Sequence, residues 1–180
     1  MTKTTEITSK LWEMANKLRG TMDASEYKNY ILPFMFYRYL SEHQDDYIRN
    51  NGLEDFYQNP EDIEEYYEDI ARSLGYVIEP QFTWNAIVDS IENHKIKASD
   101  FQDMFEAFHK HAKRNTDSEQ EFANVFFDVN LGDTRLGSGT NERAKALNDI
   151  VLMINEFDFK DESGHDILGD VYEYLIGQFA

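Results

Sequence analysis

Gly137-Ser138-Gly139 is the segment of this 180-residue chain whose residue types could bind a phosphate. Closely spaced glycines let backbone N–H groups approach a phosphate at the start of a helix. A dinucleotide-binding loop needs a third glycine three residues later, where this chain has Glu142, and no Lys-Ser or Lys-Thr pair follows as in a P-loop. The spacing therefore predicts a flexible turn before a helix rather than a nucleotide site.

Histidine is the second residue type that could do chemistry here, as a metal ligand or a general base. His109 and His111 are two residues apart, so on a helix they point to different faces and cannot chelate one ion well. The chain has no cysteine, which excludes thiolate metal sites and disulfides. We therefore predict no metal site, no catalytic residue and no cofactor-binding residue, since no nucleophile–base pair suggests an activity.

Carboxylates are concentrated between residues 54 and 69, where the chain has no lysine or arginine. Such a run could bind a metal, or imitate the charge of DNA in a free-standing acidic interaction module. Helical spacing favours a solvated helix face instead, because apolar residues recur at the intervals of the opposite face. The acidic residues are Glu54, Asp55, Glu61, Asp62, Glu64, Glu65, Glu68 and Asp69.

The only basic cluster lies between residues 94 and 114, which makes it the candidate surface for DNA contact. The whole chain has a net charge of −18, and a strongly acidic chain repels phosphate at long range. We therefore expect the isolated chain to bind DNA weakly and locally, or with the help of a partner. The candidate DNA-binding residues are Lys95, Lys97, Lys110, Lys113 and Arg114.

Helices must position these residues, because apolar side chains recur at spacings of three and four along most of the chain. The first helix is predicted from Glu6 to Arg19, with Thr8 or Ser9 as its cap. The longest is predicted from Asp23 to Asn50, kinked near Pro33 but otherwise continuous. Further helices are predicted from Pro60 to Gly75, Trp84 to Asn93, Ser99 to Ala112 and Glu142 to Phe157.

The predicted fold class is therefore mostly α, a multi-helix domain with at most a small strand pair. Tyr76-Val77-Ile78 is short, β-branched and bounded by Gly75 and Pro80, so it could be a strand or an extended connector. Residues 128–141 are irregular and could form a loop or a small hairpin. The positions open to strand are thus residues 76–78 and 129–136.

The composition is that of a globular protein, with 41% hydrophobic and 29% charged residues. No apolar run approaches the roughly 20 residues that cross a membrane, and the polar N-terminus lacks the core of a signal peptide. Together with the absence of cysteine, these features predict a cytoplasmic protein that does not associate with membranes.

The end of the chain, residues 166–180, forms one apolar stripe that continues to the last residues. We expect residues 1–165 to form the helical domain and residues 166–180 to begin a linker helix into a further domain. An uncovered stripe of this kind would drive self-association. The candidate interface residues are Tyr172, Leu175, Ile176 and Phe179.

Several segments together resemble one known family. Residues 166–180 resemble D-I-L-G-D-x-Y-E-Y-L-I-x-x-F-A, which leads into the catalytic domain of type I restriction–modification methylation subunits. Residues 11–28 resemble the family's opening, L-W-x-x-A-x-x-L-R-G-x-M-D-A-S-E-Y-K, and residues 36–41 its F-x-K/R-Y-L/I-S motif. Arg135-Leu136-Gly137 and the helix after it also fit the family order. The likeness covers the whole chain and is loose only between residues 50 and 125.

The resemblance implies the helical N-terminal domain of an N6-adenine DNA methyltransferase subunit. In that family two methylation subunits join a specificity subunit that reads duplex DNA, and a restriction subunit can be added. The methyl donor, S-adenosylmethionine, binds a Rossmann-like domain with a glycine motif and an Asn-Pro-Pro-Phe or Asn-Pro-Pro-Tyr motif. Neither motif is present in this chain. Its only Asn-Pro pair is Asn59-Pro60, followed by Glu61.

The Asn-Pro-Pro motif holds the amino group of the flipped adenine, so its absence implies that this chain alone transfers no methyl group. The resemblance thus implies subunit assembly and DNA engagement, with catalysis in a domain that follows residue 180. The alternative is a free-standing acidic helical interaction module or DNA mimic. The reading frame beyond Ala180 would distinguish them.

Overall fold

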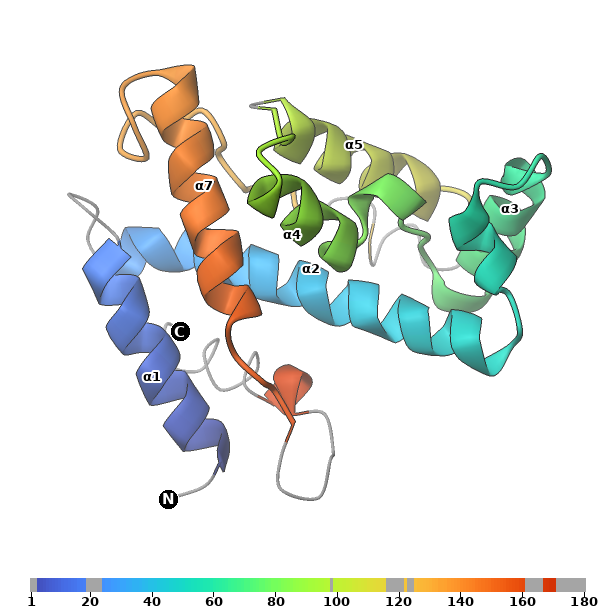
Figure 1. Ribbon diagram of the computed structural model, residues 1–180, viewed down its shortest axis with the longest axis horizontal. Coiled ribbons are helices and arrows are strands. Elements are labelled where there is room, and N and C mark those ends of the chain that lie inside the picture. The colour runs from blue at the N-terminus through green and yellow to red at the C-terminus, as the bar shows by residue number, and fades with distance from the viewer. Residues whose placement is uncertain are drawn as a thin grey trace. The chain divides into compact units, whose positions relative to one another are not determined.

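The computed structural model describes residues 3–18, 24–97, 99–115, 122, 125–160 and 167–170. No β-strand occurs in these ranges, so the prediction of a mostly α fold is confirmed. The helices, shown in Figure 1, are α1 (Lys3–Leu18), α2 (Ala24–Asn50), the 3-10 helix η1 (Glu54–Gln58), α3 (Ile63–Leu74), the 3-10 helix η2 (Pro80–Phe82), α4 (Trp84–Glu92), α5 (Asp100–Ala112) and α7 (Thr140–Asn155).

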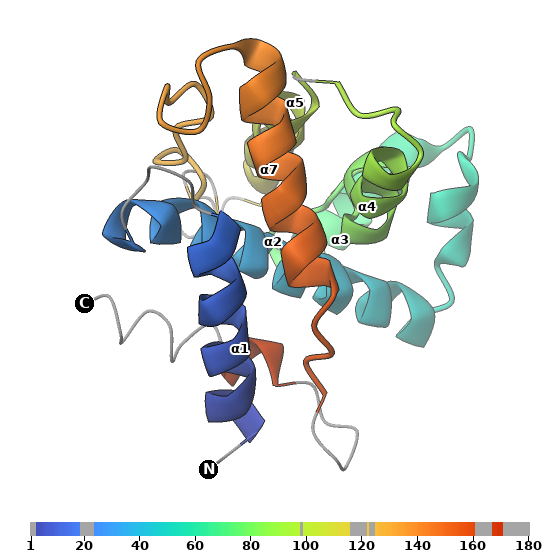
Figure 2. The ribbon, with the colours of Figure 1, turned by 60° about the vertical axis from the view of Figure 1, so that its left-hand side comes forward.

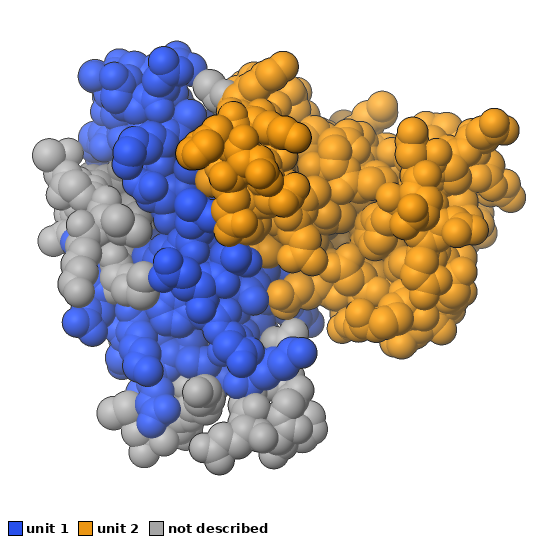
Figure 3. Space-filling model, viewed as in Figure 1, with its two compact units in different colours: residues 1–39, 131–180 blue, residues 40–130 orange. Residues whose placement is uncertain are grey.

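The chain divides into two compact units, which Figure 3 shows in different colours. Unit 1 comprises residues 1–39 and 131–180, and unit 2 comprises residues 40–130. Periodicity could not predict this division, because the unbroken helix α2 contributes residues to both units. The predicted boundary before residue 166 stays a prediction, since only residues 167–170 of that terminal segment are described.

Unit 1 contains α1 and α7, which pack against each other (Figures 1 and 2). Helix α1 begins at Lys3, so Thr8 lies buried inside the helix. The prediction that Thr8 or Ser9 caps this helix is therefore wrong. Helical spacing predicts an apolar stripe of Ile7, Leu11, Met14, Ala15 and Leu18 on this helix. Ile7 and Leu11 are buried, and the side chains of the other three lie outside the described part of the chain. Helical spacing predicts that Ala146, Leu147, Ile150, Val151 and Ile154 of α7 face the core. All are buried except Ala146, which is partly exposed.

Arg38, on α2, closes the C-terminal end of α7 within unit 1. Its Nη1 atom donates hydrogen bonds to the carbonyl oxygens of Ile154 at 2.8 Å and Phe157 at 3.2 Å. The guanidinium also lies over the ring of Phe159, 4.7 Å from the ring centroid. A cation at this position is favourable, because the last carbonyls of a helix lack partners and carry partial negative charge.

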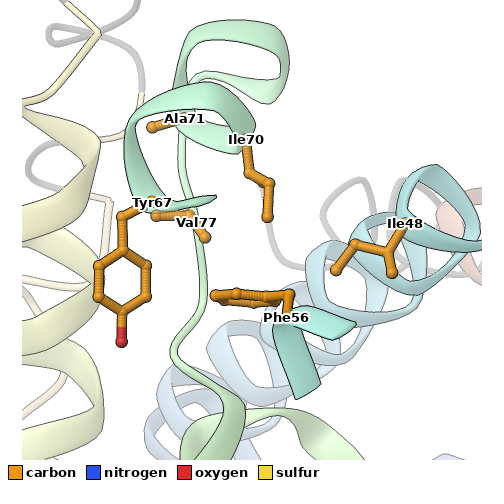
Figure 4. Close-up of a cluster of buried hydrophobic side chains, with 6 residues drawn as sticks. All are labelled: Ile48, Phe56, Tyr67, Ile70, Ala71 and Val77. Carbon is orange, nitrogen blue, oxygen red and sulfur yellow. The ribbon is translucent and has the colours of Figure 1, made fainter. Parts of the chain in front are cut away.

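The core of unit 2 contains a cluster of side chains from α2, η1, α3 and the segment after α3 (Figure 4). The rings of Phe56 and Tyr67 meet edge to face with centroids 5.7 Å apart. Helix α3 ends as predicted at Gly75, whose φ of 91° suits glycine and whose N–H bonds to the carbonyl of Ala71. The buried members of the cluster are Ile48, Phe56, Tyr67, Ile70, Ala71 and Val77.

Residues 76–78 form a buried extended connector rather than a strand. A side chain of α2 supplies the partner that a neighbouring strand would otherwise provide. Gln44 Oε1 accepts from the Ile78 N–H at 2.7 Å, and Gln44 Nε2 donates to the Ile78 carbonyl at 3.0 Å. The Tyr76 hydroxyl donates to the Leu40 carbonyl at 2.7 Å. Buried backbone groups are therefore satisfied without a sheet.

Helices α4 and α5 begin differently, although a hydroxyl residue precedes each. Thr83 caps α4, because its side chain accepts from the Ala86 N–H at 3.3 Å. Ser99 stands before α5, where its residue type predicts a cap. Its side chain makes no capping bond, so that prediction is wrong. The carboxylate of Asp100, the first residue of α5, accepts from the Lys97 N–H at 2.7 Å, which ties the preceding segment to the start of the helix.

Candidate functional site

Four of the five candidate DNA-binding residues are exposed in unit 2. Lys95 and Lys97 lie between α4 and α5, Lys110 lies on α5, and Lys113 follows its last residue. Within the described ranges none of the four makes an ion pair. Basic residues at the end of α5 also complement the helix dipole. The four lysine side chains are therefore accessible to a phosphate.

Arg114, the fifth candidate, is held by acidic residues of its own unit. Its side chain is only 15% exposed, with Nη2 2.9 Å from Oε2 of Glu64 and Nη1 paired with Glu68. The guanidinium lies over the ring of Tyr67, 5.4 Å from its centroid. Both glutamates lie on α3, one turn apart, so they can grip the two arms of one guanidinium. This arginine is therefore not available to a phosphate in the way the lysines are.

His111 lies between Arg114 and Glu79, buried to 1% exposure. The Arg114 Nε–H donates to Nδ1 of His111 at 2.9 Å. Because Nδ1 accepts, the ring proton must lie on Nε2, which is 2.8 Å from Oε2 of Glu79. The hydrogen bond from His111 holds the pKa of Glu79 below its ordinary value, against the opposing effect of burial.

The Glu79–His111–Arg114 chain fastens three segments of unit 2 together. Glu79, the residue before η2, is linked through His111 to α5. Glu64 and Glu68, which bind Arg114, extend this link to α3. Burial, and then the negative charges of Glu79 and Glu64, raise the pKa of Tyr67 beneath the guanidinium to about 12. Both nitrogens of His111 are occupied, so it cannot act as a free general base. The chain is therefore suited to structural support.

His109 faces a different part of unit 2 from His111, as the two-residue spacing predicted. Its Nε2 accepts from the Phe126 N–H at 3.1 Å, which requires a neutral ring. Burial, with a smaller effect from Lys113, lowers the pKa of His109. Its ring also meets that of Phe127 at 4.6 Å between centroids. His109 therefore positions the segment after α5.

The acidic run lies on η1, the following turn and α3, and all eight of its side chains belong to exposed residues. Tyr67 and Ile70 of α3 are buried, which matches the predicted solvated face. Asn59 has a φ of 55° and ends η1, so the Asn59-Pro60 pair forms a turn between two helices. Unit 2 contains 21 acidic and 7 basic residues, a net charge of −14, against −4 for unit 1.

Gly137-Ser138-Gly139 forms the predicted turn before a helix, and residues 128–139 form a loop rather than a hairpin. A Cβ on Gly137 would lie 2.6 Å from Glu142 Cβ and 2.8 Å from the Arg143 nitrogen. The Glu142 carboxylate lies beside Gly139, where an added Cβ would be 2.3 Å from Oε2. These glycines serve a close approach to α7, and the carboxylate would repel a phosphate or carboxylate ligand.

Asp133 and Arg135 form an ion pair in the loop before this turn. Asp133 accepts from the Arg135 backbone N–H at 2.9 Å and from its guanidinium Nη2 at 2.9 Å. These bonds lower the pKa of Asp133 to about 2. Tyr30 of α2 donates to the same carboxylate at 3.4 Å, so the pair fixes the loop within unit 1.

Other predicted features lie partly or wholly outside the described residues. The candidate interface residues Tyr172, Leu175, Ile176 and Phe179 all fall there. In the described part of the chain, no three histidine, aspartate or glutamate side chains converge as a metal site would require. None of the described helices is long and apolar enough to cross a membrane.

Sequence reasoning missed the Glu79–His111–Arg114 chain. A partial signal was present, because His111 and Arg114 are three residues apart and therefore neighbours on a helix. Glu79 is 32 residues away from His111, and no pattern in the sequence connects them. The exposed ring of Phe127 was also missed, because it lies in irregular sequence.

Comparison with known proteins supports one family. The model of the HsdM N-terminal domain family matches residues 7–154. The type I restriction enzyme MpnII methylase subunit of Mycoplasma pneumoniae is 31% identical over 97% of this chain and 35% of its own length. The type I restriction-modification system methyltransferase subunit from Streptococcus thermophilus, a crystal structure, matches with a TM-score of 0.81 and 26% identity.

That structural match covers 99% of this chain and 39% of the Streptococcus thermophilus chain. The present chain thus spans little more than a third of the length of either protein. The family match covers all of unit 2 and most of the described residues of unit 1. The chain therefore belongs to the HsdM N-terminal domain family, the helical N-terminal domains of type I restriction–modification methylase subunits.

Proposed function

We propose that this chain engages DNA and other subunits within a type I restriction–modification methylase, while a different domain performs adenine-N6 methyl transfer. The observation that carries the proposal is the family match over residues 7–154, supported by two relatives that are methylase or methyltransferase subunits. The assembly would include a specificity subunit, a second methylation subunit and, in restricting complexes, a restriction subunit. Its location would be cytoplasmic, where its DNA substrate is found.

The proposal assigns S-adenosylmethionine to the intact subunit and not to this chain. The residues that most resemble a cofactor loop do not fit the group, because Gly137 is packed against α7 and Glu142 places a carboxylate beside Gly139. No step of methyl transfer is therefore derived from these residues. We expect calorimetry with this chain to show no micromolar or tighter binding of S-adenosylmethionine, and such binding would contradict the proposal.

DNA engagement would be local, through the four exposed lysines of unit 2. The net charge of −14 on that unit opposes phosphate binding at a distance. We therefore expect weak, salt-sensitive binding of duplex DNA by the isolated chain. Removing one lysine that binds a phosphate should reduce the slope of log K against log salt by about 0.9.

The test compares two sets of lysine-to-glutamine changes by fluorescence anisotropy with duplex DNA. Neutralising Lys95, Lys97, Lys110 and Lys113 together should weaken binding and flatten the salt dependence. The control neutralises Lys10, Lys145 and Lys160, which are exposed in unit 1. Equal effects of the two sets would show that only net charge matters. Tight binding at physiological salt that survives the first set would refute this assignment.

Assembly is the second part of the proposal. The apolar stripe of residues 166–180 would pack on a catalytic domain in the intact subunit, and on a second copy of the chain when uncovered. We expect sedimentation of the wild type to show self-association that Ile176→Asp with Phe179→Asp abolishes. A strictly monomeric wild type, together with a double variant as unfolded as a core variant, would show that the stripe is internal.

A second candidate function is favoured by the eight exposed carboxylates of residues 54–69. A free-standing acidic module or DNA mimic would compete with DNA for a DNA-binding protein instead of binding DNA. Titration into a complex of the specificity subunit with its DNA target distinguishes the two functions. Release of the DNA by this chain would favour the mimic, and formation of a ternary complex would favour the methylase domain.

A further inference from the structure

Phe127 of unit 2 presents an aromatic ring to solvent. Its exposure is 65%, and the next most exposed large hydrophobic residue among those described is Val125, at 37%. The neighbouring ring of Phe126 is 3% exposed and stacks on Phe105 with centroids 4.8 Å apart. One ring of this pair is therefore anchored in the core, while the next ring in sequence remains in water.

The backbone that carries Phe127 is fixed from below. His109 Nε2 accepts the Phe126 N–H at 3.1 Å, and the His109 ring meets the Phe127 ring edge to face at 4.6 Å. His109 is itself only 6% exposed on α5. An exposed ring held in this way needs little further ordering before it contacts a ligand, which reduces the entropic cost of binding.

The charged residues of the segments that carry and support this ring have both signs. Lys113 directly follows α5, is exposed four residues after His109, and its charge acts on that histidine. Glu106 lies one turn before His109 and is bonded to Gln102 at 2.9 Å. Asp128 is exposed directly after Phe127. The segments that carry and support the ring thus include one exposed cation that could bind a phosphate, together with two carboxylates.

The size of the exposed surface limits what it can bind. Val125 and Phe127 are the only exposed large hydrophobic residues among those described, so this surface has no broad apolar patch of the kind found at the centre of a protein interface. A single nucleobase matches one aromatic ring, and stacking does not depend on positive potential. On a unit with a net charge of −14, stacking is the nucleic-acid contact least opposed by the surrounding charge.

We propose that Phe127 is a stacking contact for an unpaired nucleobase, with Lys113 binding the adjacent phosphate. The inference rests on the proposed engagement of DNA and adds a contact that reads neither base identity nor duplex shape. Single-stranded or splayed DNA is the ligand class, because a base inside an intact duplex exposes no face to a side chain.

The first measurement uses the full chain with Phe127→Trp at low salt and a thymidine oligonucleotide of about 15 nucleotides. Stacking of thymine on the new indole should quench its fluorescence. The wild type gives the background, because its Trp84 is buried and Trp12 is half-buried. An abasic oligonucleotide of equal length is the matched ligand, since it keeps the phosphates and lacks the bases. Quenching by thymidine alone is expected, and equal quenching by both would overturn the proposal.

The second measurement compares affinities by anisotropy. Phe127→Leu keeps an apolar side chain without a π-face, and we expect it to bind the thymidine oligonucleotide about tenfold more weakly. Lys113→Gln should weaken binding further, and Asp128→Asn should strengthen it. Circular dichroism checks that each variant folds, which is expected for an exposed position. Unchanged affinity in Phe127→Leu would overturn the proposal.

The outcomes separate this inference from the proposed function. If duplex binding depends on the lysines while Phe127→Leu changes nothing, DNA engagement stands and the stacking contact is refuted. If neither duplex nor single strand binds, both are refuted for the isolated chain. If Phe127→Leu instead abolishes self-association in sedimentation, the ring contacts protein and the assignment to a nucleobase is refuted.

Discussion

The Nε2 atom of His111 lies 2.8 Å from Oε2 of Glu79, and the Arg114 Nε–H donates to the other nitrogen of the same ring. A buried imidazole thus fixes its own tautomer by bridging a carboxylate and a guanidinium. Glu79 is 32 residues from His111 in the sequence, so the bridge forms only when unit 2 is folded.

Glu79→Gln should make the stability of the chain less dependent on pH. The folded-state pKa of Glu79 is lowered from its ordinary value of 4.5, so its contribution is present above pH 4.5 and is lost as the pH falls further. Loss of a hydrogen bond to a charged group should cost about 1.5–3 kcal/mol at pH 7. Urea unfolding at pH 7 and pH 4 measures both effects. The exposed Glu92→Gln is the control, and equal effects of the two changes would contradict the prediction.

Arg114→Lys should destabilise unit 2 even though it keeps the charge. Lysine cannot hold two glutamates and His111 at once, and we expect a loss of about 1–3 kcal/mol in unfolding free energy. Glu64→Gln should cost less, up to about 1 kcal/mol, because that side chain is 74% exposed. Arg72→Lys, at a side chain 74% exposed, is the matched control. A smaller loss of unfolding free energy for Arg114→Lys than for Glu64→Gln would show that the forked geometry of the guanidinium is unimportant.

Gly137→Ala should destabilise the chain far more than the addition of a side chain at Gly139. The new Cβ would meet Glu142 Cβ and the Arg143 backbone, which cannot move independently, so we expect a loss of about 1–3 kcal/mol. At Gly139 the obstacle is the flexible end of Glu142, and serine suits the cap position before α7. Gly139→Ser should therefore be neutral or slightly stabilising. Thermal unfolding of the two variants decides, and equal losses would contradict the close-packing argument.

Asp45→Asn should stabilise the chain at neutral pH. Burial raises the pKa of Asp45 above its ordinary value of 3.8, while Tyr57 donates to its Oδ1 at 2.5 Å. The contribution of Asp45 is therefore present below pH 3.8 and is lost as the pH rises through the folded-state pKa. Asparagine keeps an acceptor for Tyr57 without the buried charge.

The difference in melting temperature between Asp45→Asn and wild type should be positive at pH 7 and vanish near pH 3. Asp46→Asn removes a partner of Arg49 at an exposed position and should be neutral or slightly destabilising. A lower melting temperature for Asp45→Asn at pH 7 would mean that the ionised carboxylate stabilises the native state.

Local sequence determined most of the helices, and tertiary contacts determined what it failed to predict. The end of α3 at Gly75 and the stripe of α7 follow from glycine chemistry and helical period. Ser99 precedes α5 but its side chain makes no capping bond, and the Asp100 carboxylate beside it bonds backward to the Lys97 N–H. The division into two units was not predictable either, since a helix that serves both has no break in its pattern.

The candidate site shows the same division. Exposure of the lysines follows from their chemistry, whereas the capture of Arg114 depends on α3, about 50 residues earlier in the chain. Phe127 could not be identified as exposed because phenylalanine is usually buried, and its loop has no period that assigns a face.

The bonds between Gln44 and Ile78 also bear on aggregation. Tyr76-Val77-Ile78 has the β-branched and aromatic composition of segments that add to the edge of a growing fibril. In the folded chain the polar groups of Ile78 face one carboxamide, and all three residues are buried. By binding the backbone of Ile78, Gln44 therefore keeps residues 76–78 from pairing with the backbone of neighbouring molecules.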